Sequence, residues 1–154
     1  MRKRKTKSDS ILIGVAGEYF VAGELSKKGY IASITLKNTR EIDILVSNRD
    51  ATKSVGIQVK STRYSNSRSW MLNEKSENYY ADNLFYVFVN LKEENQRPDF
   101  FVVPSKIVAK HIAKSYKRWL KNPNRSGGKH KDSSIRKFRD EGETYLERWD
   151  LLKL

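Results

Sequence analysis

The chain of 154 residues contains 31 Lys and Arg against 18 Asp and Glu, which gives a formal net charge of +13. This surplus favours a polyanion as partner, either nucleic acid or an anionic membrane surface. No apolar run is long enough to span a bilayer, so no membrane insertion is expected. Cysteine is absent, which excludes disulfides and thiolate metal sites and fits a cytoplasmic protein whose metal ligands would be oxygen atoms.

A basic segment opens the sequence and reads MRKRKTK over residues 1–7. We expect residues 1–9 to form a flexible basic arm, which either contacts phosphate groups or only keeps the protein in solution. The hydrophobic content of 38% over this chain length permits one core. Residues 10–154 are therefore predicted to form a single domain.

The first predicted element is a helix over residues 10–28, ended by Gly29. Its apolar stripe consists of Ile11, Val15, Ala22 and Leu25. Glu18 falls inside this stripe, where an unpaired carboxylate is unfavourable. We therefore expect Glu18 either to serve a bound metal or to form a buried ion pair, for example with Lys60.

Alternating apolar residues predict two neighbouring strands at residues 41–46 and 56–61, after a short strand at 30–34. If the apolar sides of the two strands share one core, Asp43, Gln58 and Lys60 meet on the opposite face. An acid, an amide oxygen and an amine together provide the groups of a metal-dependent phosphodiester-cleaving site. The alternative is an ordinary solvated sheet face with a weak cross-strand ion pair.

The second half of the chain continues the alternation of strands and helices. We predict a short strand at 69–72, a helical turn at 74–80, buried strands at 83–90 and 99–104, a helix at 105–120, a loop at 122–134 and a last helix at 141–152. This order predicts an α/β fold with a mixed sheet flanked by helices.

Several basic residues are candidates for binding DNA. Lys106, Lys110 and Lys114 recur every turn of the helix after Pro104, so they would lie in a row that can follow a phosphate backbone. The same row would equally suit an ordinary solvated helix face. Arg63 and Arg68 follow the second strand closely and flank residues that could contact backbone and unstacked bases. Trp70 fits either that surface or the core.

The ordered set of Glu18, Asp43 and Gln58-Val59-Lys60 resembles the PD-(D/E)XK nuclease superfamily, in the branch where Gln replaces the second acid. The resemblance extends over about the first two-thirds of the chain, by the order of its elements. One departure is that Ile42, not proline, precedes Asp43.

The resemblance implies a restriction-endonuclease-like fold and a site that uses Mg²⁺, or Mn²⁺ in its place. Asp43 would be the principal metal ligand, helped by the side-chain oxygen of Gln58 and the backbone carbonyl of Val59. Glu18 would hold a metal-bound water or a second ion, and Lys60 would orient the attacking water. Members of the family often act as dimers, so the resemblance also allows a homodimer.

The resulting hypothesis is a metal-dependent endonuclease that hydrolyses phosphodiester bonds in DNA, of restriction, repair or recombination type. The main alternative is a catalytically inactive nucleic-acid-binding protein that keeps the nuclease fold. A basic interaction or membrane-surface protein is the third alternative, and the lack of a strongly amphipathic helix with aromatic anchors argues against it.

Overall fold

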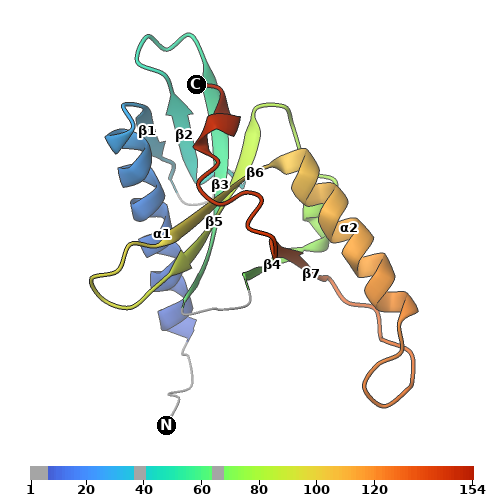
Figure 1. The fold of residues 1–154 in the computed structure, drawn as a ribbon. Coiled ribbons are helices and arrows are strands. Elements are labelled where there is room, and N and C mark those ends of the chain that lie inside the picture. The colour runs from blue at the N-terminus through green and yellow to red at the C-terminus, as the bar shows by residue number, and fades with distance from the viewer. Residues whose placement is uncertain (1–6, 37–40, 64–67) are drawn as a thin grey trace.

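A five-stranded mixed sheet forms the centre of the computed structural model, which describes residues 7–36, 41–63 and 68–154 (Figure 1). The strand order is β1-β2-β3-β5-β6, and a separate two-stranded ribbon is formed by β4 and β7. The elements are α1 (Lys7–Lys27), β1 (Ile31–Ile34), β2 (Ile44–Ser47), β3 (Ser54–Arg63), β4 (Ser69–Asn73), the 3-10 turn η1 (Glu74–Glu77), β5 (Leu84–Leu91), β6 (Asp99–Pro104), α2 (Ser105–Lys121), β7 (Ile135–Arg139) and the 3-10 turn η2 (Trp149–Leu152).

The sheet is antiparallel at both sides and parallel at its centre. β1 pairs with β2 and β2 with β3 in antiparallel register, β3 and β5 run parallel, and β6 returns antiparallel to β5. The parallel pair requires a crossover, which β4 and η1 supply. β3 thus has an antiparallel neighbour, β2, on one side and a parallel neighbour, β5, on the other.

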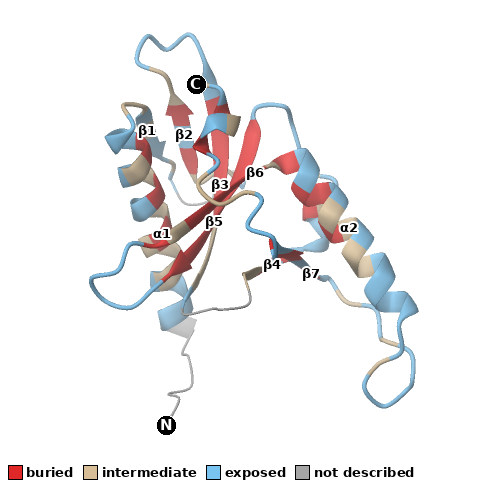
Figure 2. Cartoon of the chain, viewed as in Figure 1, coloured by how far each residue is buried: buried red, intermediate tan, exposed pale blue. Residues whose placement is uncertain are grey.

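Two apolar layers cover the two faces of this sheet (Figure 2). On one face, Val21 and Leu25 of α1 pack on alternate residues of the strands, and Trp149 and Leu152 of η2 complete that layer. On the other face, the buried aromatic rings of β5 and β6 pack against the β4–β7 ribbon and α2. The sheet is therefore buried on both sides along β5, whose eight residues are all buried.

Close contact between α1 and β3 depends on Gly17. A Cβ atom at this position would overlap the Ser61 hydroxyl and lie 3.0 Å from Ser61 Cβ and 3.5 Å from Val59 Cγ1. The missing side chain lets the helix lie directly on the half of β3 that carries Gln58 and Lys60. Glu18 is the next residue of the helix.

The predicted α/β architecture with a mixed sheet is confirmed, and the strands predicted at 83–90 and 99–104 lie within one residue of β5 and β6. The predicted first helix is present but begins at Lys7, so residues 7–9 of the expected basic arm are helical. Residues 1–6 lie outside the described ranges. Within those ranges, no helix combines the length and the apolarity needed to cross a membrane.

The helix predicted at 141–152 is wrong. Glu143 and Glu147 adopt positive φ angles of 54° and 55°, which interrupt a helix, and only η2 remains. The Asp140 carboxylate instead accepts hydrogen bonds from the N–H groups of Thr144 and Tyr145 and holds the chain in a turn. Residues 145–147 then run along the outer edge of β6, where Glu147 N–H donates to the carbonyl of Phe100.

Strand β7 was not expected, since residues 122–134 were predicted as a loop and the next predicted element began at 141. It pairs with β4 along its whole length and completes the ribbon that covers the second face of the sheet.

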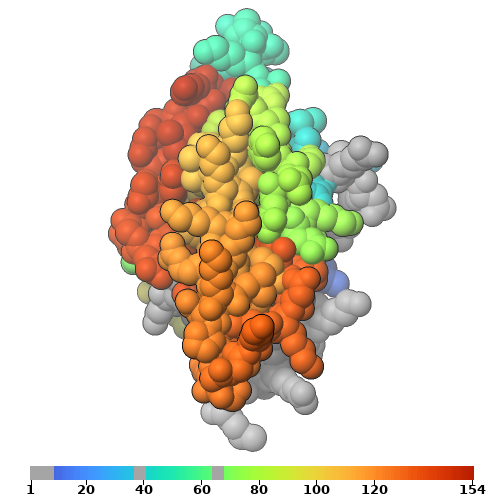
Figure 3. Space-filling model, turned by 90° about the vertical axis from the view of Figure 1, so that its right-hand side faces the viewer, coloured from blue at the N-terminus to red at the C-terminus, as the bar shows by residue number. Residues whose placement is uncertain are grey.

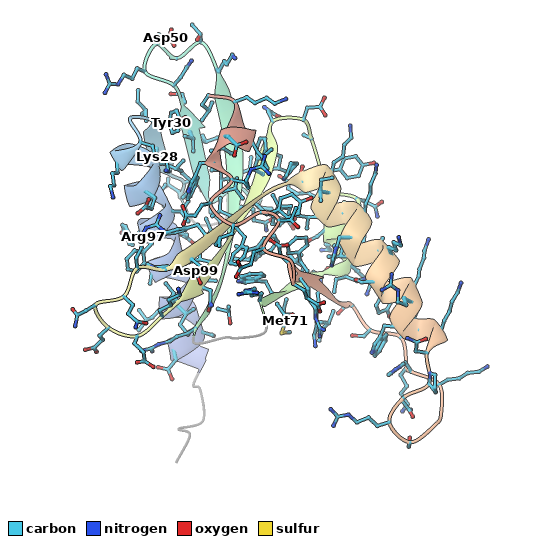
Figure 4. All side chains as sticks on the ribbon, in the orientation of Figure 1. Lys28, Tyr30, Asp50, Met71, Arg97 and Asp99 are labelled. Atoms are coloured by element: carbon cyan, nitrogen blue, oxygen red, sulfur yellow. The ribbon has the colours of Figure 1, made fainter. Side chains whose placement is uncertain are left out.

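Arg97 links α1 to the C-terminal segment and lies beside α1 in Figure 4. Its guanidinium forms ion pairs with Glu24 of α1 at 2.9 Å and with Glu147 at 2.6 Å.

Candidate functional site

Asp43 is held where the chain enters β2. Its N–H donates to the carbonyl of Ile57 at 2.8 Å, and its carbonyl accepts from the N–H of Thr35 at 2.9 Å. Its carboxylate Oδ2 accepts a hydrogen bond from the N–H of Val59 at 2.7 Å. The backbone of Asp43 is thus fixed by both neighbouring strands, and its side chain reaches the edge of β3.

This placement differs in one detail from the expected strand at 41–46. β2 begins only at Ile44, because Glu41 has a positive φ of 45° and the chain turns before it can continue the ladder. The Asp43 side chain takes the place of the missing backbone partner of Val59. The carboxylate therefore lies beside the strand residue that separates Gln58 from Lys60.

The electrostatic environment links Asp43 to the face opposite α1. Burial raises the pKa of the Asp43 carboxyl, while the hydrogen bond from Val59 and the charge of Lys60 oppose that rise. Burial also raises the pKa of Tyr86 to about 12, and the charges of Glu41 and Asp43 add to the effect. Lys60 and Tyr86 belong to the adjacent strands β3 and β5 and lie on the same face of the sheet.

Gln58 contributes a buried oxygen. It lies opposite Tyr86 in the parallel register of β3 and β5 and is only 5% exposed. Its Oε1 atom has no hydrogen-bond partner among the described residues. A buried acceptor without a partner is unfavourable, and a bound ion or water is a common reason for one.

Val59 and Lys60 point to opposite sides of β3. The Val59 side chain is buried in the layer under α1, and its carbonyl lies at the same strand edge as the N–H that Asp43 accepts. Lys60 is half-buried on the same face as Gln58. Asp43, Gln58, Val59 and Lys60 are therefore brought together around one stretch of β3.

Glu18 occupies a less defined place. It is half-buried on α1, directly after the glycine that lies against Ser61, and it takes part in an interaction of its own. No group of three acidic or histidine side chains suited to a metal exists within residues 7–36, 41–63 and 68–154. A metal at this site would therefore need the amide oxygen of Gln58 and the carbonyl of Val59 beside its carboxylates. These hard oxygen donors fit Mg²⁺.

The predicted DNA-binding residues lie on several surfaces. Lys110 and Lys114 are exposed on α2, and Lys106, also exposed, lies 3.3 Å from the carboxylate of Asp82. Arg63 is exposed at the end of β3, and Arg68 forms an ion pair with Glu143.

Trp70 belongs to the core. It is 2% exposed, and its indole N–H donates to the carbonyl of Val89 at 3.0 Å. A DNA path past Arg63 and Arg68 would therefore lack this ring, and residues 64–67, which were part of that hypothesis, lie outside the described ranges.

Sequence reasoning missed Tyr86. It lies in the apolar run of β5, where an aromatic residue reads as core, and its ring is indeed fully buried. The only available signal was its polar hydroxyl in an otherwise apolar strand. The structure shows that this hydroxyl shares the face of Gln58.

Comparison with solved structures supports the fold. The bacterial homing endonuclease I-Ssp6803I is similar over 94% of this chain and 93% of its own, with a TM-score of 0.55 and 13% sequence identity. Hjc, a Holliday junction resolvase from Archaeoglobus fulgidus, matches over 86% of this chain and 91% of its own, with a TM-score of 0.43 and 16% identity. No family model and no curated protein sequence matches the chain. The protein thus has an α/β fold similar to that of a homing endonuclease.

Proposed function

We propose that the protein is a metal-dependent endonuclease that hydrolyses phosphodiester bonds in DNA and belongs to the Gln-x-Lys branch of the PD-(D/E)XK nucleases. Three observations support the proposal. The fold is shared with a homing endonuclease, the net charge is +13, and the residues of the motif lie around one stretch of β3. Restriction, repair and recombination are all compatible with these features.

Mg²⁺, or Mn²⁺ in its place, is the proposed cofactor. The carboxylate of Asp43, the Oε1 atom of Gln58 and the carbonyl of Val59 would hold it, with Glu18 contributing from α1. When bound, a divalent ion of this kind lowers the pKa of a water molecule and neutralises charge on the phosphate. The unpartnered Oε1 atom of Gln58 is the observation that fits this role, since an ion would satisfy it.

The side chains of this chain would perform the remaining steps. Lys60 would orient the attacking water and stabilise the negative charge that develops on the phosphate oxygens. Asp43 keeps its carboxylate aimed by the hydrogen bond from Val59, so little reorganisation is needed on substrate binding. Glu18 would hold a metal-bound water or a second ion from its position on α1.

The contact between Asp43 and the Gln58-Val59-Lys60 segment carries the proposal. Its test is cleavage of plasmid and branched DNA with and without Mg²⁺ or Mn²⁺. Asp43→Ala and Lys60→Ala should each abolish metal-dependent cleavage while the fold and DNA binding are retained. Asp43→Ala should also lower the melting temperature, because the N–H of Val59 loses its acceptor. Lys53→Ala, an exposed lysine on the β2–β3 hairpin, is the matched control and should cleave normally.

One outcome would favour the alternative function. Gln58 replaces an acid, and the described residues contain no cluster of three acidic or histidine ligands. If purified protein binds DNA but shows no cleavage with either metal, a binding protein that keeps the nuclease fold is the better description. Cleavage that persists in both Asp43→Ala and Lys60→Ala would refute this site altogether.

A second copy of the chain is a further proposed partner. β1 is an outer strand of the sheet, and the face it shares with β2 carries Ile31 and Leu45, which are 52% and 51% exposed. Burying such apolar side chains in a homodimer would remove them from water. Sedimentation should show a dimer that Leu45→Lys dissociates, whereas a monomeric wild type would end this proposal.

A further inference from the structure

A cavity of about 730 Å³ lies between the second half of α2 and the strand β7. Its lining includes Arg118 and Trp119 from the helix and Ile135, Lys137 and Arg139 from the strand. Figure 3 shows this side of the molecule, with α2 running down the middle and the β7 region beside its lower half. None of the residues proposed for catalysis lines the cavity, so it is a separate feature.

One wall of the cavity is aromatic. Trp119 is 40% exposed, whereas the other two tryptophans, Trp70 and Trp149, are buried. Its ring stacks on the His130 ring with centroids 3.9 Å apart and lies 5.5 Å from the ring of Tyr116. Exposed rings that already lie in a stack offer a surface onto which another flat ring can be added.

Cations from both α2 and β7 also line the cavity. Arg118 and Lys137 form no ion pair with any residue in the described ranges, and Arg139 reaches the Glu141 carboxylate only at 3.8 Å. Glu141 is the single acid in the lining. Positive charge is therefore in surplus here, and an anionic ligand would meet cations whose charge is not already neutralised.

The walls are held in place before any ligand arrives. The Tyr116 hydroxyl bonds the Asp132 carboxylate and accepts from the N–H of Ser133 at 2.8 Å. The Arg136 guanidinium lies 3.4 Å from the centre of the Tyr116 ring and pairs with Glu77 of η1. Such a framework lowers the entropy lost when a ligand is bound.

We propose that this cavity binds unpaired nucleotides of a DNA strand. A base would stack on the ring of Trp119, and the adjoining phosphates would meet Arg118 and Lys137. The volume is within the range of small-ligand sites, and the pairing of stacking rings with cations is the general mode of single-strand binding. Bases of an intact duplex are stacked on one another and cannot reach such a wall.

The inference rests on the proposed function for its choice of DNA, and it adds a substrate class. The preferred substrate would carry unpaired nucleotides near the cleavage point, as branched, gapped or flapped DNA does. The lysine row of α2 does not predict this preference, because phosphate contacts alone do not distinguish paired from unpaired strands by base.

Tryptophan fluorescence gives a direct test that needs no cleavage. Wild-type protein in EDTA is titrated with a short oligothymidylate, with a duplex of equal length and with thymidine monophosphate. Because Trp119 is the one exposed tryptophan, stacking at the cavity should quench the accessible part of the emission. The expected result is saturable quenching by the single strand, weaker binding of the duplex and little effect of the mononucleotide.

Variants then locate the binding site. Trp119→Leu should weaken single-strand affinity about tenfold in an anisotropy assay with labelled oligonucleotide, as loss of one stacked base predicts. Lys137→Glu should weaken it and lower the salt slope by about 0.7 for each phosphate that the variant no longer neutralises. Lys53→Glu makes the same charge change on the distant hairpin and should have a smaller effect than Lys137→Glu.

Equal affinity for duplex and single strand, or unchanged single-strand affinity in Trp119→Leu, would overturn the inference. Tight binding of the mononucleotide would overturn it too, in favour of a free-nucleotide site. Metal-dependent cleavage of plasmid by the wild type is scored separately. If the wild type does not cleave plasmid but its tryptophan fluorescence is still quenched by the single strand, the result counts against the proposed function alone.

Discussion

The edge of β3 and the cavity beside β7 both combine cations with polar or aromatic groups, but they do so under different physical conditions. Around Asp43 the groups are buried or half-buried, one acceptor has no partner among the described residues, and burial raises the pKa of the acid. Beside β7, Lys137 and Arg139 are exposed to solvent, whereas Arg136 is buried. Buried groups respond strongly to a metal ion or a proton, whereas exposed cations respond gradually to salt.

The largest contrast is expected between two lysines. Lys60→Met should lower kcat/KM for metal-dependent cleavage by about 100- to 1,000-fold, as for other donors that stabilise transition-state charge. Lys137→Met removes an exposed cation and should lower it much less, mainly through weaker binding. Steady-state cleavage of one DNA substrate by both variants measures the contrast. Similar losses in the two variants would show that the β3 edge has no special role.

The position of α1 on β3 can be tested with two glycines. Gly17→Ala adds a Cβ where Ser61 already lies, and overpacking of this kind typically destabilises by about 1–3 kcal/mol. Gly14→Ala adds the same atom where nothing lies within 4 Å and should stabilise the helix by about 0.5–1 kcal/mol. Urea unfolding of both variants gives the free energies. Equal stability of the two would mean that α1 does not lie close on β3.

The buried amide oxygen predicts a response to metal. Gln58→Glu would place a charge beside Asp43 in a site of low exposure, so the melting temperature without metal should fall. Adding Mg²⁺ should then raise it by more than in the wild type, because a third acid strengthens metal binding to the folded state. Gln96→Glu, on the exposed β5–β6 loop, is the matched control. A variant whose melting temperature ignores Mg²⁺ would argue against Gln58 as a metal ligand.

A smaller effect concerns pH. The folded-state pKa of Asp43 is raised above its ordinary value of 3.8, so the neutral acid contributes stability below 3.8 that is lost as pH rises through the folded pKa. Asp43→Asn keeps an oxygen for the Val59 N–H and cannot ionise. Its stability relative to wild type should therefore increase from acid to neutral pH in metal-free urea unfolding.

Asp50→Asn provides a control of opposite sign. Hydrogen bonds from Thr52 lower the pKa of Asp50, so its charged form contributes stability above the ordinary value that is lost as pH falls. Removing that charge should therefore not stabilise the protein at neutral pH. If both variants show the same pH trend, burial is not the factor that sets the pKa of Asp43.

The main sheet was predictable because its strands have a simple pattern. Val55, Ile57 and Val59 recur at every second position of β3, and β5 is apolar apart from Asn90. The sequence therefore predicts which faces of these strands are buried. The pairing of Asp43 with Val59 was not predictable in detail. It depends on the positive φ of Glu41, which shortens β2, and glutamate does not signal such a conformation.

The ribbon and its cavity were hidden for a different reason. β7 reads IRKFR, and three cations among five residues resemble a loop. Arg136 is nevertheless buried, because it pairs with Glu77, a residue 59 positions earlier in the chain. Burial of a charge through such a distant partner cannot be inferred from local pattern. The cavity could therefore not be expected from the sequence, although the loop at 122–134 before it was predicted.

The segment at residues 145–147, which runs along β6, has a consequence for synthesis. Until it emerges from the ribosome, β6 exposes the unpaired backbone edge that Phe100 and Val102 present, and the layer under α1 lacks Trp149. Open strand edges are templates for pairing between chains. We therefore expect nascent chains stalled before residue 145 to bind chaperones and to aggregate. Chains that include residues 145–147 should complete folding.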